Sequence, residues 1–186
     1  MPAFDQVTID TARLHLRPLC MDDTADILRI RSNADVMLYM STAPWIDIGQ
    51  AIAMVERDQA AMPKGEFLRL GLIRKTDQAF LGSCTLFHLD AGCCRAEIGY
   101  DMDAAAWGQG YMHEALVALL NYGFNEMNLN RVEADIDPRN LNSAKSLERL
   151  GFIREGFLRE RWIIDGVVSD TALYGLLRSD WLARGS

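Results

Sequence analysis

Residues 96–127 constrain the fold of this chain more than any other stretch of the sequence. A strand-like segment, "AEIGYDM", is followed by a short loop that contains Gly108 and Gly110, and then by a helical pattern over residues 111–127. The apolar residues of that pattern lie on one stripe, which predicts a helix packed against a sheet: Met112, Leu116, Leu119, Leu120 and Met127. Glycine destabilises a helix by about 1 kcal/mol relative to alanine, so two glycines here indicate special backbone geometry or a ligand at close range.

The position of the two glycines favours an anion-binding site. The first N–H groups of a helix have no intrahelical partner, and the helix dipole adds partial positive charge there. A P-loop is excluded because no Lys-Ser or Lys-Thr pair follows Gly110, and a dinucleotide fingerprint would need a third glycine where His113 stands. Two interpretations remain, a different phosphate-binding loop and a tight turn beneath the helix.

The rest of the chain alternates between strand and helix patterns. Asp22 and Asp23 are possible N-caps of the first helix. We expect strands at 13–19, 66–73, 79–89 and 130–136, helices at 22–40, 49–62 and 141–152, and a hairpin over 157–177 that turns at "DGV". These elements predict an α+β fold with a mostly antiparallel sheet flanked by helices. One domain over residues 1–186, with its core at about 10–182, is expected for a chain of this length.

Composition excludes several classes of protein. A net charge of −7 without a Lys/Arg cluster disfavours a nucleic-acid partner. No segment approaches the roughly 20 apolar residues that span a bilayer, and the first residues do not resemble a signal peptide, so we expect no membrane association and a cytoplasmic location. Four cysteines without a CxxC pattern, and three histidines, predict neither a disulfide framework nor a metal site. Cys93 and Cys94 are expected to stay reduced in a turn.

Three segments in the same order and spacing resemble a known superfamily. They are "AEIGYDMDAAAWGQGYMHEAL" (96–116), "RVEADIDPRNLNSAKSLERLGFIREG" (131–156) and "IDGVVSDTALYGLL" (164–177). Together they resemble the GNAT N-acetyltransferases, and within them the RimJ/RimL branch of ribosomal-protein N-terminal acetyltransferases. The resemblance implies a GNAT fold and direct transfer of an acetyl group from acetyl-CoA to a primary amine, on a protein N-terminus or a small molecule, by a monomer or homodimer.

The resemblance also assigns the coenzyme site. In the family, a loop before the central helix binds the pyrophosphate, and the matching block is Trp107, Gly108, Gln109, Gly110, Tyr111 and Met112. Met112 replaces a small residue of the family pattern, so either its side chain points into the core or the pyrophosphate contact is altered. The preceding strand offers its backbone to the pantetheine arm, here at Tyr100, Asp101 and Met102.

Asn140 and Ser143 match the family's "NxxS" before "LGF". An Asn directly before a helix is also a natural N-cap, so a capping role and a coenzyme-binding role are both open for Asn140. Many members carry a Tyr four residues before "GF" that protonates the departing thiolate, but this chain has Leu147 there. Ser143 lies one helical turn earlier on the same face, and the resemblance to the RimJ/RimL branch implies that it is the proton donor.

The general base is less well defined by the sequence. An amine that is protonated at neutral pH must lose a proton before it can attack a thioester. Asp135, Glu97 and Glu160 are the candidate carboxylates, each of which could instead be a solvated or ion-paired surface group, and a water chain could replace all three.

Aromatic and acidic residues near the expected acceptor side complete the prediction. Trp45, Trp162 and Tyr174 would line the acceptor pocket or belong to the core, and Asp170 would bind a substrate ammonium or fix the hairpin. Met112 and the uncertain base leave a second function open, a module that senses acetyl-CoA without turning it over.

Overall fold

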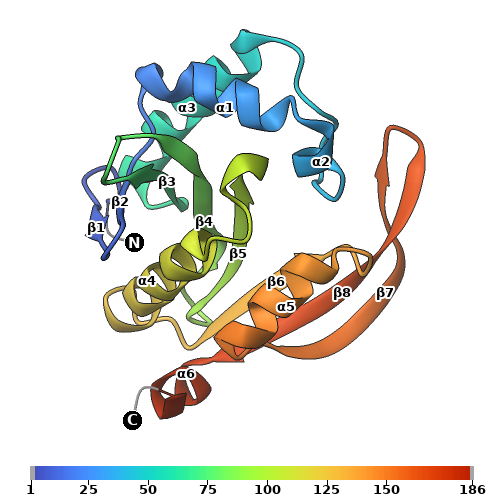
Figure 1. The fold of residues 1–186 in the computed structure, drawn as a ribbon. Helices are drawn as coiled ribbons and strands as arrows, with labels where there is room; N and C mark the ends of the chain where they lie inside the picture. Colours follow the sequence, from blue (N-terminus) through green and yellow to red (C-terminus); the bar gives the residue numbers. More distant parts are fainter. Residues whose placement is uncertain (1–2, 185–186) are drawn as a thin grey trace.

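The computed structural model describes residues 3–184 and contains one eight-stranded sheet with the order β1-β2-β3-β4-β5-β6-β8-β7 (Figure 1). The predicted domain of 1–186 extends beyond this described range at both ends. Neighbouring strands are antiparallel except β5 and β6, which are parallel. The strands are β1 (Ile9–Asp10), β2 (Leu14–Arg17), β3 (Leu68–Arg74), β4 (Phe80–Asp90), β5 (Arg95–Met102), β6 (Arg131–Ile136), β7 (Ile153–Ile164) and β8 (Val167–Leu177). The predicted α+β class with a mostly antiparallel sheet is therefore confirmed.

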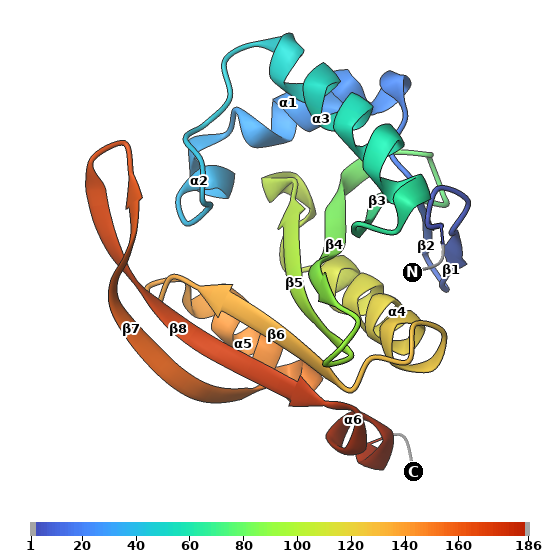
Figure 2. The same ribbon diagram turned by 180° about the vertical axis from the view of Figure 1, so that it is seen from behind.

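Helices cover both faces of this sheet. They are α1 (Thr24–Arg31), α2 (Ala34–Met37), α3 (Ile48–Ala61), α4 (Tyr111–Asn125), α5 (Leu141–Leu150) and α6 (Arg178–Arg184), with short 3-10 helices at Met21–Asp23, Met62–Lys64 and Ala104–Ala106. Figures 1 and 2 show α1 and α3 together on one side, and α5 along β6 and β8 in the other half of the molecule. Within residues 3–184, no helix has the length and apolar character needed to cross a bilayer.

Two hydrophobic clusters hold the helices to the sheet. The larger one lies under α4 and α5, where Leu116, Leu119 and Leu120 of the predicted stripe are completely buried. The smaller one includes Ile27 and Ile30 of α1, and it joins α1 and α3 to the sheet. Burying a leucine contributes about 1.5–3 kcal/mol, so the stripe explains why α4 is fixed in place although it begins at a glycine.

The sheet is split between β5 and β6. These strands pair only over Arg95–Glu97 and Arg131–Glu133. Beyond these residues they diverge, as Figure 2 shows, while β5 stays paired with β4 as far as Met102 and β6 stays paired with β8. Within the described part of the chain, the edge of β5 that faces β6 therefore has no partner strand beyond Glu97.

Local polar contacts explain where the structure departs from the predicted elements. The expected helix over 22–40 is broken, because Asn33 Oδ1 accepts a hydrogen bond from Asp35 N (2.9 Å) and starts α2 as a new helix. Asp23 does not cap α1 with its side chain, since its carboxylate accepts from Cys20 N and pairs with Arg17. Strand β7 begins at Ile153, before the predicted hairpin, and β1 and α6 were not predicted.

The hairpin turn and the end of α5 agree with the sequence. Asp165 and Gly166 both have positive φ, 48° and 78°, as a two-residue hairpin turn requires. Gly151 has φ 94° and ends α5 in the left-handed region. Cys93 and Cys94 are free thiols in the turn between β4 and β5.

Candidate active site

The loop before α4 has the left-handed geometry that its glycines indicate. Gly108 and Gly110 have φ of 73° and 79°, values that strain residues with a Cβ, and Gly110 is the N-cap residue of α4. A Cβ placed on Gly108 would meet no atom of the described chain within 4 Å. Trp107 Nε1 donates to Met102 O (2.9 Å), which ties the loop to the end of β5. The start of α4 is therefore open to an anion, and no side chain among the described residues caps it.

Met112 does not block this loop. Its side chain is partly buried and packs against the larger hydrophobic cluster, which is the first of the two alternatives raised by the sequence. Tyr111 also packs against this cluster, and its ring lies 4.4 Å from the Arg13 guanidinium carbon. The unusual methionine thus packs against the core.

A pair of hydroxyl groups connects β5 to α5. Tyr100 Oη and Ser143 Oγ are 2.8 Å apart, and Ser143 is 9% exposed. Burial raises the pKa of Tyr100 to about 12, against a smaller opposite effect of its hydrogen bond to Ser143, so the phenol is neutral at neutral pH. The sequence analysis assigned a role only to the backbone of Tyr100. The signal for its side chain is the period of two along β5, which places Tyr100 on the same face as the buried Ile98 and Met102.

Asn140 caps α5. Its Oδ1 atom accepts a hydrogen bond from Ser143 N (3.0 Å), so the capping role considered for Asn140 is present in the structure. The cap orients the first turn of α5 and with it the Ser143 side chain. The amide nitrogen of Asn140 is not used by this cap and can still donate to a ligand.

Asp135 lies beside the split, on the face of β6 opposite α5. It follows the last β5–β6 pair along β6, and its Oδ1 atom accepts from the buried Thr171 Oγ1 (2.8 Å). Trp162 Nε1 lies 3.4 Å from the same oxygen, and Arg161 Nε lies 3.9 Å from Oδ2. These contacts hold one carboxylate oxygen and leave the other without a short ion pair. The sequence prediction did not include Thr171.

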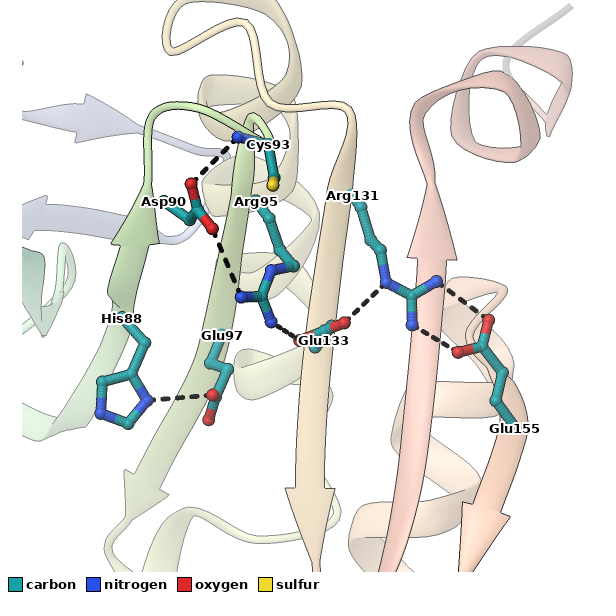
Figure 3. Close-up of polar contacts among 8 residues, drawn as sticks. All are labelled: His88, Asp90, Cys93, Arg95, Glu97, Arg131, Glu133 and Glu155. Carbon is teal, nitrogen blue, oxygen red and sulfur yellow. Dashed lines mark hydrogen bonds and ion pairs between the residues drawn. The ribbon is translucent and has the colours of Figure 1, made fainter.

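Glu97 is the last residue of β5 that pairs with β6, and its carboxylate already has a partner. His88 Nδ1 lies 2.9 Å from Glu97 Oε1, as Figure 3 shows. Glu97 lies next to a row of ion pairs that crosses the sheet through Asp90, Arg95, Glu133, Arg131 and Glu155 (Figure 3). Burial raises the pKa of Glu133, but the bonds from Arg131 and Arg95 outweigh it and keep that pKa below its usual range.

Asp101 points away from Tyr100, toward α1. Its Oδ1 atom accepts from Ser83 N (3.0 Å) and Ser83 Oγ (2.8 Å), and Oδ2 lies 2.6 Å from Arg31 Nη2. The Arg31 guanidinium lies over the Trp45 ring, 4.8 Å from its centroid. Trp45 therefore packs beside a buried ion pair at the α1 side of the site. Arg31 was not among the predicted residues.

The other residues predicted for the acceptor side lie in different parts of the structure. Trp162 shares the face of Asp135, as their contact shows. Tyr174 does not line that face, because it is 5% exposed and belongs to the cluster under α5. Asp170 Oδ1 accepts from Glu160 N (2.8 Å), where Glu160 has φ 52° at an irregularity of β7, so Asp170 fixes the hairpin. Glu160 is exposed at that irregularity.

Residues 3–184 contain no group of three or more His, Cys, Asp or Glu side chains that could hold a metal ion. The site combines a split sheet, a helix N-terminus without a side-chain cap, and two partly buried hydroxyls at the split. This architecture is that of an acetyltransferase. Residues 13–153 match the family model of the acetyltransferase (GNAT) domain, and the chain belongs to this family, consistent with its RimJ/RimL branch.

Known proteins are similar to this chain in sequence or in structure, over most of its length or over part of it. An uncharacterized N-acetyltransferase, p20, from Bacillus licheniformis is 34% identical over 174 residues, which are 94% of this chain and 98% of that protein. The [ribosomal protein uS5]-alanine N-acetyltransferase of Escherichia coli is 30% identical over 119 residues, 63% of this chain and 61% of that protein. The structure of Mycobacterium smegmatis RimJ in complex with CoA-disulfide has a TM-score of 0.85 at 24% identity, covering 100% of this chain and 98% of that chain.

Proposed function

We propose that this protein transfers the acetyl group of acetyl-CoA to a primary amine by direct attack of the amine on the thioester. The observation that carries this proposal is the position of the open N-terminus of α4 at the end of β5, whose edge toward β6 has no partner strand beyond Glu97 in the described chain. One ligand with a diphosphate and an extended arm would use both features. Coenzyme A has these two parts in this order.

The coenzyme would be held mainly by backbone groups. The N–H groups at Gly108–Met112 would bind the pyrophosphate, because the helix dipole and the missing Cβ atoms both favour an anion there. The pantetheine arm would lie along β5 at residues 100–102 as an added strand. Asn140 at the start of α5 would donate its amide N–H to the coenzyme from the other side of the split.

The acetyl transfer needs a base, an oxyanion donor and an acid. Asp135 accepts the proton of the substrate ammonium, directly or through water, and the neutral amine attacks the thioester carbonyl. A backbone N–H of β5 stabilises the tetrahedral oxyanion. After the attack the nitrogen carries one proton too many, which it loses through water as the amide forms. When the C–S bond breaks, the sulfur takes a proton from Ser143, and this water-borne proton restores the Ser143 hydroxyl. A thiol with a pKa near ~8.5 leaves readily, so no covalent enzyme intermediate is needed.

Tyr100 would orient the hydroxyl of Ser143. A neutral phenol in a 2.8 Å contact can donate its proton to Ser143 Oγ. The serine then keeps its own proton for a different acceptor, the departing sulfur. Tyr100 would thereby act on the reaction through Ser143.

The acceptor would approach from the face that carries Asp135 and Trp162, opposite α5. The Escherichia coli relative is named as a [ribosomal protein uS5]-alanine N-acetyltransferase. A protein N-terminus beginning with a small residue is therefore the first acceptor class that we propose, and a small amine is the second. A carboxylate beside an indole ring suits either kind of cationic amine.

Thiol release tests this proposal. The protein would be incubated with acetyl-CoA and a panel of alanine-initiated peptides, amino acids, aminosugars and small amines, while calorimetry measures CoA binding. We expect CoA to bind and at least one acceptor to raise thiol release above the control without acceptor. Binding of CoA with no release for any acceptor would instead support an acetyl-CoA sensor, and an absence of binding would refute both functions.

Asp135→Asn tests the assignment of the base. We expect a decrease of about 100-fold in kcat, the usual effect of losing general base catalysis, with little change in the affinity for CoA. Glu126→Gln is the control, because Glu126 is an exposed carboxylate at the C-terminal end of α4. A comparable loss in Glu97→Gln or Glu160→Gln, with an active Asp135→Asn variant, would move the base to that residue.

A further inference from the structure

The turn between β1 and β2 is joined to the first turn of α4 by one carboxylate. Glu114 Oε1 accepts from Thr11 Oγ1 (2.6 Å) and from Arg13 N (2.8 Å), and Glu114 Oε2 accepts from Arg13 Nε (2.6 Å). Burial disfavours the charged carboxylate, but the bonds from Thr11 and Arg13 outweigh it, so the pKa of Glu114 lies below its usual range. Residues about a hundred positions apart in the sequence are thereby fixed to each other.

Arg13 continues from this carboxylate to the loop before α4. Its Nη1 atom donates to Gln109 O (2.9 Å), and its guanidinium carbon lies 4.4 Å from the centroid of the Tyr111 ring. Its Nη2 atom lies 3.4 Å from where a Cβ on Gly110 would be. One side chain therefore bonds to Gln109, lies over the ring of Tyr111 and lies close to Gly110 between them.

The bond to Gln109 O fixes the direction of a neighbouring amide. The peptide between Gln109 and Gly110 is planar and trans, so its carbonyl and its N–H point in opposite directions. Because Arg13 holds the carbonyl, the N–H of Gly110 points away from Arg13. Glycines on both sides of Gln109 would otherwise allow this peptide to rotate more freely than in an ordinary loop.

We propose that Arg13, held by Glu114, is a positioning residue that orients the Gly110 amide for the pyrophosphate of the coenzyme. This inference rests on the proposed function, since it assumes that coenzyme A binds at this loop. Arg13 orders the loop in the free protein, so the coenzyme does not have to order it on binding, and Arg13 does not contact the reacting atoms. Its effect should therefore appear in coenzyme affinity and leave the rate of acetyl transfer unchanged.

A direct contact between Arg13 and a phosphate is the competing explanation, and Glu114 distinguishes the two. Removing a negative charge near a phosphate would strengthen binding if Arg13 acted by charge alone. Removing the carboxylate that orients Arg13 would weaken binding if Arg13 acts by positioning. The two explanations predict opposite signs for Glu114→Gln.

Calorimetric titration of CoA and of 3′-dephospho-CoA into the full chain tests this proposal. We expect Kd for CoA to rise by about 5- to 30-fold in Arg13→Ala, corresponding to the ordering of roughly one residue's backbone. Arg13→Lys should behave similarly, because a lysine lacks the planar fork, and Glu114→Gln should also weaken binding. The fold-change should be the same for both ligands, since both contain the pyrophosphate.

Arg74→Ala is the matched control. Arg74 lies 5.9 Å from the same Tyr111 ring and interacts with the Tyr111 side chain, but it pairs with the exposed Asp77, and none of the described hydrogen bonds joins it to Gln109 or Gly110. We expect its Kd for CoA to equal that of the wild type. The NMR order parameter of the Gly110 N–H in the free protein should fall in Arg13→Ala and stay unchanged in Arg74→Ala, which separates a local loosening of the loop from a general loss of stability.

Three outcomes would overturn the proposal. They are an unchanged Kd in Arg13→Ala, tighter binding in Glu114→Gln, or a loss of affinity that disappears with 3′-dephospho-CoA, which would assign Arg13 to the 3′-phosphate. Wild-type protein that does not bind CoA would refute the proposed function itself. The two failures are thus distinguished by the wild-type titration.

Discussion

Replacing Ser143 by alanine should slow acetyl transfer and leave the fold intact. The N-cap of α5 uses the backbone N–H of Ser143, which an alanine retains, and alanine is a strong helix former. The variant loses the hydroxyl that lies 2.8 Å from Tyr100 Oη. A hydrogen bond to a charged group contributes about 1.5–3 kcal/mol, and about 1.36 kcal/mol corresponds to a tenfold change in rate. We therefore expect the rate to fall by about 10- to 150-fold.

Tyr100→Phe should have a smaller effect that depends on Ser143. The phenol acts through a hydrogen bond between neutral groups, which contributes about 0.5–1.5 kcal/mol, so the rate should fall by about 2- to 10-fold. In the double variant with Ser143→Ala, removing the phenol should cause no further loss. Two residues that act as one unit are non-additive in this way.

The assay is a single-turnover measurement of acetyl transfer, with the acceptor found by the thiol-release screen, because product release can hide a chemical step under steady-state conditions. Ser146→Ala is the control on the same helix, since Ser146 Oγ donates to Asn142 O and lies outside the split. A wild-type rate in Ser143→Ala would refute the role of Ser143 as an acid. A Tyr100→Phe effect that persists without Ser143 would show that the phenol acts independently.

Three further predictions concern the loop, the buried charges and pH. Gly110→Asp should abolish CoA binding in calorimetry because its carboxylate would lie where the phosphate binds, whereas Gly166→Asp, with a similar φ of 78° in an open turn, should bind normally. Asp101→Asn should lower Tm by about 6–12 °C, since it leaves the largely buried Arg31 guanidinium without its charged partner at a cost near 3 kcal/mol, whereas breaking an exposed pair costs at most about 1 kcal/mol. The raised pKa of Tyr100 contributes about 3 kcal/mol to the free energy of unfolding, and this contribution is present below pH ~10 and lost as the pH rises to about 12. The free energy of unfolding of Tyr100→Phe, measured by urea titration, should lack this part of the decline.

The sequence predicted the parts of the molecule that depend on local periodicity. The stripe of α4 and the positive φ of Gly108, Gly110 and Gly166 follow from residue type and spacing. The break between α1 and α2 could not be predicted from apolar spacing, since it depends on a single Asn33 cap inside an otherwise helical pattern. The apolar spacing favours one continuous helix and the Asn33 cap favours a new one, and tertiary packing determines which of the two forms.

The face on which each strand residue lies could not be predicted without the register between strands. Tyr174 pairs with Ala134 and shares its buried face, whereas Asp135 pairs with Leu173 and faces the opposite side. A shift of one residue would exchange these two faces. The link from Arg13 to Glu114 was inaccessible for the related reason that no sequence pattern joins two charges so far apart.

The row of ion pairs explains why the sheet opens where it does. Arg95 reaches from β5 to Glu133 on β6 (2.7 Å), at the level where these strands are still paired, and Arg131 on β6 joins Glu133 to Glu155 of β7 (Figure 3). These contacts fasten β5 to the C-terminal strands at the closed end of the split. Beyond them the edge of β5 lacks a strand partner in the described chain, and an open edge is a site where an extended ligand can add. A coenzyme arm that adds to this edge can bind only the folded chain, so CoA should raise the free energy of unfolding by RT ln(1 + [L]/Kd) and with it Tm.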